Sequence, residues 1–151
     1  MTTTIAPSAV RWFTDVRMRI LVEEPAVGIV EGEARAGNMP PLHVHHDADE
    51  CFYVVEGRLS VFLPGRRLEL EAGDAAFAPR AVPHAYRVES ETARWIAVCT
   101  PGGFAAFIRE ASVPAEGDGY APEELMPPPE ELGALAAKQR IDILGPPGLL
   151  P

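Results

Sequence analysis

Short alternations of apolar and polar residues fill most of the first hundred positions. Leu68 and Leu70, for example, alternate with Glu69 and Glu71, which indicates a half-buried strand because successive side chains of a strand point to opposite faces. The pattern predicts strands at residues 10–14, 15–22, 27–35, 43–45, 50–56, 59–63, 68–71, 84–88 and 92–100, and a short one around residue 77. Many short strands separated by turn signals predict an all-β antiparallel barrel or sandwich.

Glycine has two uses in this predicted barrel. Gly57 and Arg58 are expected to form a tight hairpin turn between strands 51–55 and 59–63. Gly28 and Gly32 lie inside a predicted strand, where glycine indicates a bulge or a close approach of another group. No long helical period precedes residue 101, which argues against alternating α/β units.

The pattern changes to helical spacing beyond residue 101. Phe104, Phe107, Ile108 and Ala111 form one apolar face, which predicts a helix that covers an edge or the mouth of the barrel. Residues 115–129 indicate an irregular loop, acids near residue 130 indicate a second helix start, and the Gly145-to-Gly148 segment is expected to end regular structure. We therefore expect a single domain over residues 1–151, with a barrel core at about 10–100 and a short C-terminal helical extension at 101–151.

The segment from residue 43 to residue 57 carries the candidate chemistry. His43 and His45 are alternate residues of a strand, so both side chains point to one face. Glu50 begins the next strand after a short polar turn that contains His46 and Asp49, and pairing of the two strands would bring Glu50 beside the histidines. Two imidazoles and a carboxylate that converge indicate a metal site. His46 and Asp49 are interpreted as solvated turn residues and not as ligands.

A lone histidine farther along the chain supplies a fourth candidate ligand. His84 follows a proline-bounded loop and begins a predicted strand. Three imidazole nitrogens and one carboxylate oxygen suit one divalent transition metal. Iron, nickel, cobalt, manganese, copper and zinc all accept these ligands, so the sequence does not identify the metal.

The spacing of these residues resembles the first sequence motif of the cupin superfamily. Gly37, His43, His45, Glu50 and Gly57 fit G-x5-H-x-H-x3-4-E-x6-G at every position. The resemblance implies a small antiparallel barrel, a double-stranded β-helix or jelly roll, with a metal bound by the histidines and the glutamate.

The second cupin motif, G-x5-P-x-G-x2-H-x3-N, is matched less completely. Gly73, Pro79 and His84 fit it, whereas Ala81 replaces its glycine and Val88 replaces its asparagine. Those two positions are structural in the family, so the departures concern the loop and leave the ligand set unchanged.

Three further side chains are candidates for a substrate pocket. Phe52 and Val54 share strand parity with Glu50, and Tyr86 shares it with His84. Each of the three either lines a cavity or belongs to an ordinary barrel core. An apolar cavity beside a metal would suit an aromatic or hydrophobic small molecule.

Composition excludes several classes of protein. The chain has 151 residues, of which 47% are hydrophobic, so it is globular. Its net charge of −9 argues against binding to nucleic acid or to an anionic membrane, both of which need basic patches. No apolar run is long enough to span a bilayer and the N-terminus lacks the features of a signal peptide, so we expect a cytoplasmic protein. Two cysteines are too few for a disulfide scaffold.

Four segments carry a narrower resemblance: His-x-His-x4-Glu, Phe-Tyr-Val-Val-Glu-Gly, Gly-Asp through Pro-His, and Thr100-Pro101-Gly102-Gly103-Phe104, which leads into the C-terminal helix. On these segments the chain most resembles, within the cupins, single-barrel proteins similar to quercetin 2,3-dioxygenase. That resemblance implies a dioxygenase that cleaves an aromatic or enol-type substrate such as a flavonol, with dioxygen as co-substrate and Glu50 as the catalytic base. The alternatives are a non-oxidative cyclase, isomerase or lyase, in which Glu50 or Tyr86 moves protons, and a small-molecule-binding barrel. The family also implies a homodimer.

Overall fold

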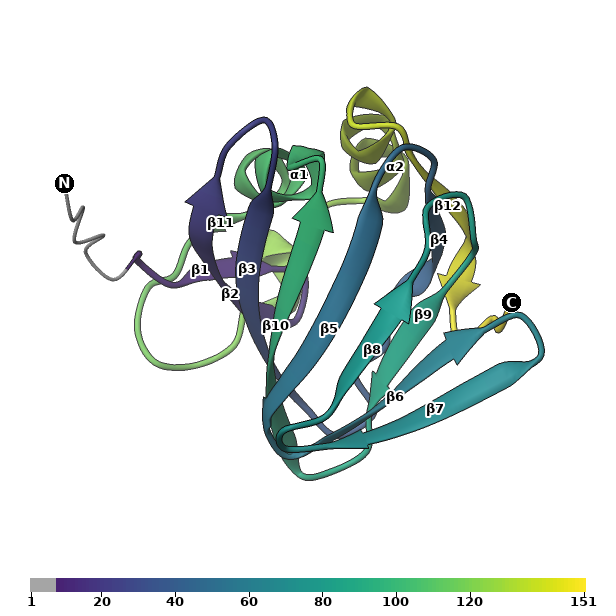
Figure 1. Cartoon of the computed structure of the whole chain (residues 1–151). Helices are drawn as coiled ribbons and strands as arrows, with labels where there is room; N and C mark the ends of the chain where they lie inside the picture. Colours follow the sequence, from purple (N-terminus) through teal and green to yellow (C-terminus); the bar gives the residue numbers. More distant parts are fainter. Residues whose placement is uncertain (1–7) are drawn as a thin grey trace, which may run out of the picture.

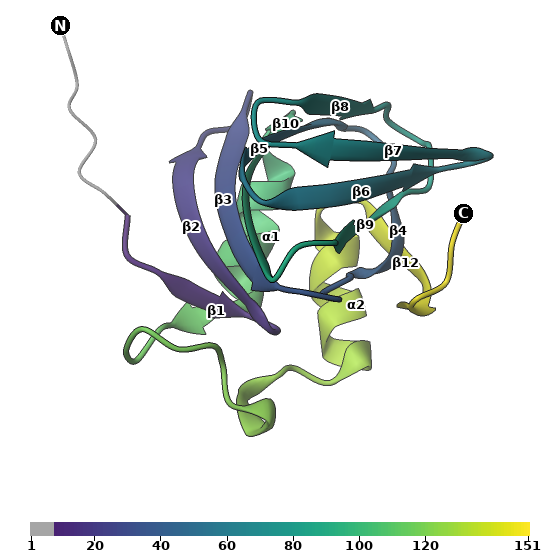
Figure 2. The ribbon, with the colours of Figure 1, turned by 90° about the horizontal axis from the view of Figure 1, so that it is seen from below.

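Antiparallel strands make up most of the computed structural model, which describes residues 8–151. A large sheet has seven strands, in the order β11 (Val113–Pro114), β1 (Arg11–Phe13), β2 (Val16–Glu23), β3 (Gly28–Arg35), β10 (Thr92–Thr100), β5 (Asp49–Glu56) and β8 (Ala75–Ala78). Facing it are a three-stranded sheet of β7 (Arg66–Glu71), β6 (Arg58–Leu63) and β9 (Ala85–Val88), and a two-stranded sheet of β12 (Ile141–Pro147) and β4 (Pro41–His45). An isolated bridge between His43 and His84 joins these two smaller sheets. The expected all-β barrel is confirmed (Figures 1 and 2).

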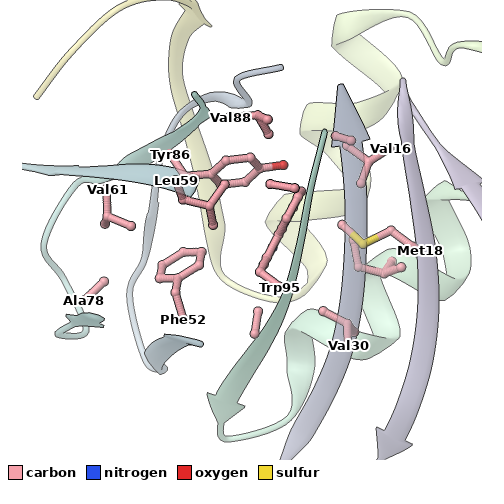
Figure 3. Close-up of a cluster of buried hydrophobic side chains, with 14 of the residues drawn as sticks. Val16, Met18, Val30, Phe52, Leu59, Val61, Ala78, Tyr86, Val88 and Trp95 are labelled. Carbon is pink, nitrogen blue, oxygen red and sulfur yellow. The ribbon is translucent and has the colours of Figure 1, made fainter. Parts of the chain in front are cut away.

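Side chains that alternate along these strands fill the space between the sheets. Phe52, Val54 and Trp95 are each at most 1% exposed, and Figure 3 shows Phe52 and Trp95 among the residues that meet inside. The Trp95 ring lies directly over Gly32, where an added Cβ atom would be 2.6 Å from the ring atom Cζ2. The glycine is therefore a close approach, one of the two readings that its place in the strand allowed.

The helices pack at one end of the sheets (Figure 1). The helix α1 (Gly103–Ala111) contacts β2, β3, β10 and α2 (Pro129–Lys138), and α2 also contacts β12. Phe107 and Ile108 of α1 and Leu132 of α2 are buried, so the apolar face predicted for residues 104–111 does cover the barrel. A short 3-10 helix, η1 (Glu123–Leu125), lies in the connecting loop. Among residues 8–151, none of the helices is long and apolar enough to cross a bilayer.

The turn at Gly57 differs from the prediction. Gly57 has a φ of 77°, and an added Cβ atom would lie 2.3 Å from the backbone oxygen of Thr92. However, β5 pairs with β10 and β8, whereas β6 pairs with β7 and β9. The expected hairpin between strands 51–55 and 59–63 is therefore wrong. The glycine instead forms a corner at which the chain leaves the large sheet and enters the facing one.

The structure also differs from the prediction that regular structure ends at Gly145 to Gly148. The strand β12 continues to Pro147, which pairs with Pro41 of β4 beyond a shift in register after Ile143. Proline has no N–H to donate, and it is tolerated here because β12 lies at the edge of its sheet. The C-terminal extension consequently contains a strand that borders β4, the strand that carries two candidate ligands.

Candidate metal centre

Four polar side chains converge inside the barrel from three separate segments. His43 and His45 project from β4, Glu50 from β5, and His84 from the residue before β9. One ligand atom of each residue lies within 4.8 Å of the ligand atoms of the other three. The structure thus brings together all four residues that the sequence singled out for a metal.

The route by which Glu50 reaches the histidines differs from the expected one. Strand β4 pairs with β12, and through the bridge at His43 with His84, whereas β5 belongs to the large sheet. The two strands that flank the polar turn are therefore not paired with each other. Glu50 faces the histidines because the two sheets face each other across the core.

A single carboxylate oxygen lies at the centre of the cluster. The Nε2 atom of His84 donates a hydrogen bond to Oε2 of Glu50 at 2.8 Å. The Nε2 atom of His45 lies 3.1 Å from the same oxygen, but it is not aligned for a hydrogen bond and has no such partner among the described residues. His45 and Glu50 are each 3% exposed and His84 is 1% exposed, so these three side chains are almost fully shielded from bulk solvent, whereas His43 is half-buried.

Backbone carbonyl groups set the orientation of two of the rings. The Nδ1 atom of His43 donates to the carbonyl oxygen of Pro41 at 2.9 Å, and Nδ1 of His84 donates to the carbonyl oxygen of Val82 at 3.0 Å. Each ring therefore presents its Nε2 atom to the cluster. Such a backbone contact fixes the tautomer of a metal-binding histidine and turns its free nitrogen toward the ion.

The protonation states follow from burial and from mutual charge. Burial, assisted by the neighbouring charges of His84 and His45, lowers the pKa of His43 to about 3. Burial alone would raise the pKa of Glu50, but the close contact with His45 and the charge and hydrogen bond of His84 outweigh it and lower that pKa below its usual range. Burial likewise opposes the charged form of His84, yet the Glu50 carboxylate raises its pKa. These directions favour a neutral His43 beside a hydrogen-bonded His84–Glu50 pair.

The residues fit a divalent transition metal. Ligand atoms bound at about 2.1 Å from one ion are at most about 4.2 Å apart, so the widest pair of this cluster needs to close only slightly. The buried Nε2 atom of His45 lacks a partner that a cation would provide. Imidazole nitrogens with one carboxylate oxygen are typical ligands of iron, nickel, cobalt, manganese, copper and zinc.

An apolar cavity of about 1220 Å³ opens beside the cluster. Two of the three predicted pocket residues, Phe52 and Tyr86, line it, together with His43 and Glu50 of the cluster. Val54 is not among the lining residues and is fully buried in the core. The cavity walls also include residues that the sequence analysis did not assign to a pocket: Phe13, Trp95, Phe104, Phe107, Leu132, Ile141 and Ile143. Many of these come from the C-terminal extension, which therefore forms part of the cavity.

His46 and Asp49 lie outside the cluster, as expected, although Asp49 is the first residue of β5 and not part of the turn. His46 is exposed, and its Nε2 atom lies 2.8 Å from Oδ2 of Asp142 on β12. Asp49 forms an ion pair at 3.0 Å with Arg80, which holds the pKa of the carboxyl group below its usual range. Neither residue belongs to the group whose atoms converge at the site.

Cys99 is the neighbour of the cluster that sequence reasoning missed. It pairs with Glu50 across β10 and β5 and is fully buried. Burial and the nearby Glu50 carboxylate raise the pKa of its thiol well above the ordinary value, so the sulfur stays protonated. Strand parity with Trp95 and Ala97 was the available signal, because alternate residues of a strand face the same side.

The sequence of this chain matches one family model and several curated proteins. The family model described as "Cupin domain" matches residues 30–99. The quercetin 2,3-dioxygenase of Bacillus subtilis (strain 168) is 32% identical over 89 residues, which are 59% of this chain and 26% of that protein. The matched segments span between about a quarter and about half of the curated relatives, from 26% to 54% of their lengths.

Solved structures share the fold. KdgF from Halomonas sp. superposes with a TM-score of 0.55 and 26% identity over 58% of this chain and 79% of that one. The polyketide cyclase RemF from Streptomyces resistomycificus superposes with a TM-score of 0.57 and 24% identity over 66% of this chain and 80% of that one. At such low identity the second likeness concerns the fold alone.

Proposed function

The chain belongs to the cupin superfamily, and from that premise we propose that it is a metal-dependent dioxygenase that cleaves an aromatic or enol-type small molecule. The observation that carries the proposal is the convergence of His43, His45, Glu50 and His84 at the wall of a largely apolar cavity. The segment shared with a quercetin 2,3-dioxygenase supports the choice of reaction.

The four side chains would hold the metal and would leave coordination positions open toward the cavity. A bound divalent transition metal supplies a Lewis acid for a substrate oxygen and, where it is redox-active, a path for electrons to dioxygen. His43 would take part as a neutral ligand, since burial keeps its pKa at about 3. The backbone contacts of His43 and His84 keep the Nε2 atoms of both rings turned toward the cluster, where they would bind the metal.

Glu50 is the residue that would accept the enol proton of the substrate. Its Oε2 atom faces His84 and His45, which leaves Oε1 as the carboxylate oxygen that these two histidines do not engage. The carboxylate also lines the cavity, so Oε1 is the atom within reach of a bound enol. A positioned base of this kind contributes roughly 10²- to 10⁴-fold to a rate.

The aromatic walls would orient the substrate and exclude water. Phe52 lies 6.1 Å from His84 between ring centroids, and Phe104 lies 5.4 Å from His45. Both rings line the cavity, so a flat apolar substrate would contact them while its oxygen atoms face the cluster. Apolar walls next to the reacting atoms favour the substrate over bulk water.

Oxygen consumption tests the proposal. The protein is stripped of metal, reconstituted in turn with iron, nickel, cobalt, manganese and copper, and supplied with a flavonol under air, with redox-inert zinc as the control. We expect oxygen uptake with at least one metal, its loss by roughly 10²-fold or more in Glu50→Gln, and no change in His46→Gln, a matched exposed histidine beside the site. Absence of uptake with all five metals contradicts the proposal. Turnover of an enol substrate without oxygen would favour the cyclase or isomerase alternative.

A further inference from the structure

The cavity has a second polar region besides the metal centre. The hydroxyl of Tyr86 donates a hydrogen bond to Oδ1 of Asn38 at 3.1 Å, and Nδ2 of Asn38 donates to Oδ1 of Asp15 at 2.7 Å. All three residues line the cavity. Tyr86 is 7% and Asn38 8% exposed, whereas Asp15 is half-buried. These three residues are here called the Tyr86–Asn38–Asp15 chain, which is shielded from bulk solvent at its Tyr86 and Asn38 members.

Aromatic rings separate the Tyr86–Asn38–Asp15 chain from the metal centre. The Phe52 ring lies between the two, with its centroid 6.1 Å from that of His84 and 6.2 Å from that of Tyr86. The Trp95 ring is 4.8 Å from Tyr86 on another side. Figure 3 shows the hydroxyl of Tyr86 directed from β9 toward the part of the core where Val16 lies, across from Phe52. The polar chain and the metal centre are therefore two ends of one aromatic surface.

The Tyr86–Asn38–Asp15 chain has donors and acceptors that no described residue uses. A phenolic oxygen accepts as well as donates, an amide nitrogen carries two hydrogens, and a carboxylate has two acceptor oxygens. Among residues 8–151, the Tyr86 oxygen accepts no hydrogen bond, Nδ2 of Asn38 makes one contact, and Oδ2 of Asp15 makes none. Buried polar groups are unfavourable without partners, so groups like these in a cavity wall are suited to a polar ligand atom.

We propose that the Tyr86–Asn38–Asp15 chain binds a hydroxyl group at the distal end of an elongated aromatic substrate whose other end lies at the metal centre. The inference rests on the proposed function and narrows its substrate class to flat phenols with oxygen atoms at both ends. A phenolic hydroxyl both donates and accepts, so it matches a wall that offers the Asp15 carboxylate beside an amide and a tyrosine. The cavity of about 1220 Å³ is large enough for more than one fused ring.

A purely structural role is the competing explanation. Asn38 lies in the loop before β4, and its backbone oxygen accepts a hydrogen bond from the backbone N–H of Val88 at 3.0 Å. The side-chain contacts of Asn38 would then serve only to fix that loop. A structural role predicts that substitutions weaken the binding of every ligand alike, whereas a recognition role predicts that they weaken only ligands with the distal hydroxyl.

Binding of a matched pair of probes separates the two roles. The protein, stripped of metal, is titrated calorimetrically with 2-naphthol and with naphthalene, which differ only by the hydroxyl group. We expect 2-naphthol to bind about threefold to tenfold more tightly, as one hydrogen bond implies. Tyr86→Phe and Asn38→Leu should remove this preference and leave the Kd for naphthalene unchanged. Tyr53→Phe, an exposed tyrosine of the large sheet, is the matched control and should keep the preference.

Three outcomes overturn the inference. The first is equal affinity of the wild-type protein for the two probes. The second is a preference that survives in both Tyr86→Phe and Asn38→Leu but disappears in His43→Gln, which would locate the hydroxyl at the metal centre. The third is an equal loss of naphthalene binding in the variants, which assigns the chain a structural role. Because the titration needs neither metal nor oxygen, it can fail while oxygen uptake succeeds, and the reverse also holds.

Discussion

His43 should make the metal-free protein sensitive to mild acid. Burial and the neighbouring histidines lower the pKa of its imidazole from 6.5 to about 3. Between these two values the unfolded chain binds a proton at His43 that the folded protein excludes. The free energy of unfolding is therefore highest, as far as this residue is concerned, above pH 6.5, and it falls as the pH drops below that value.

The size of the effect follows from the shift. Each pH unit between the two pKa values changes the free energy of unfolding by about 1.36 kcal/mol. Acidification from pH 7.5 to 5 crosses about 1.5 units of that interval, so His43 should lower stability by about 2 kcal/mol. His84 has the opposite sign, because its raised pKa adds stability that is present below pH 6.5 and is lost as the pH rises through its folded value. Its contribution is therefore constant below pH 6.5, in the interval in which the contribution of His43 changes.

Urea unfolding of chelator-treated protein at the two pH values measures the change. We expect His43→Gln to lose about 2 kcal/mol less than the wild-type protein on acidification, whereas His46→Gln, whose ring is exposed, should behave like the wild type. An equal loss in wild type and His43→Gln would refute the reasoning. If His43→Gln does not fold, the ring protons of His43 followed by NMR in the wild-type protein decide the matter, since an inflection near pH 6.5 would also refute it.

Three other predictions concern packing, backbone strain and cysteine reactivity. Gly32→Ala places a methyl group against the Trp95 ring and should lower the free energy of unfolding in urea by about 1–3 kcal/mol; an unchanged midpoint would contradict this. Ala81 has a φ of 62°, so Ala81→Gly should raise that free energy by about 0.5–1 kcal/mol, and a lower Tm would count against it. Cys51, which is exposed, should react with a thiol reagent in the folded protein, and buried Cys99 only after unfolding; rapid reaction of both would show that the core opens.

The candidate ligand set was predictable because the local spacing of these residues identifies it. His43 and His45 share a strand face by simple alternation, and the motif spacing added Glu50 and His84. The contact between them depends on which strands pair, and local periodicity does not contain this information. The expected pairing across the polar turn was wrong for that reason, as was the hairpin at Gly57: the residues before and after a tight turn look alike whether the chain doubles back or passes to another sheet.

The cavity wall was even less predictable from local periodicity, because it also depends on which strands pair. Ile141 pairs with His45 and Ile143 with His43, although about a hundred residues of chain separate them. Two prolines and two glycines around residue 146 obscured the strand, because they normally end one. Ala81 is the opposite case: the sequence showed alanine where the second motif has glycine, and the structure shows why glycine is favoured there, since this residue adopts the left-handed conformation.

The position of β12 bears on when the site is assembled during synthesis. Residues 43, 45, 50 and 84 are translated early, but β4 has its partner strand only after residues 141–147 have left the ribosome. Until then, β4 lacks its edge and the C-terminal wall of the cavity is missing. A metal bound at this cluster would therefore reach its fully walled site only after the C-terminal segment has been synthesised.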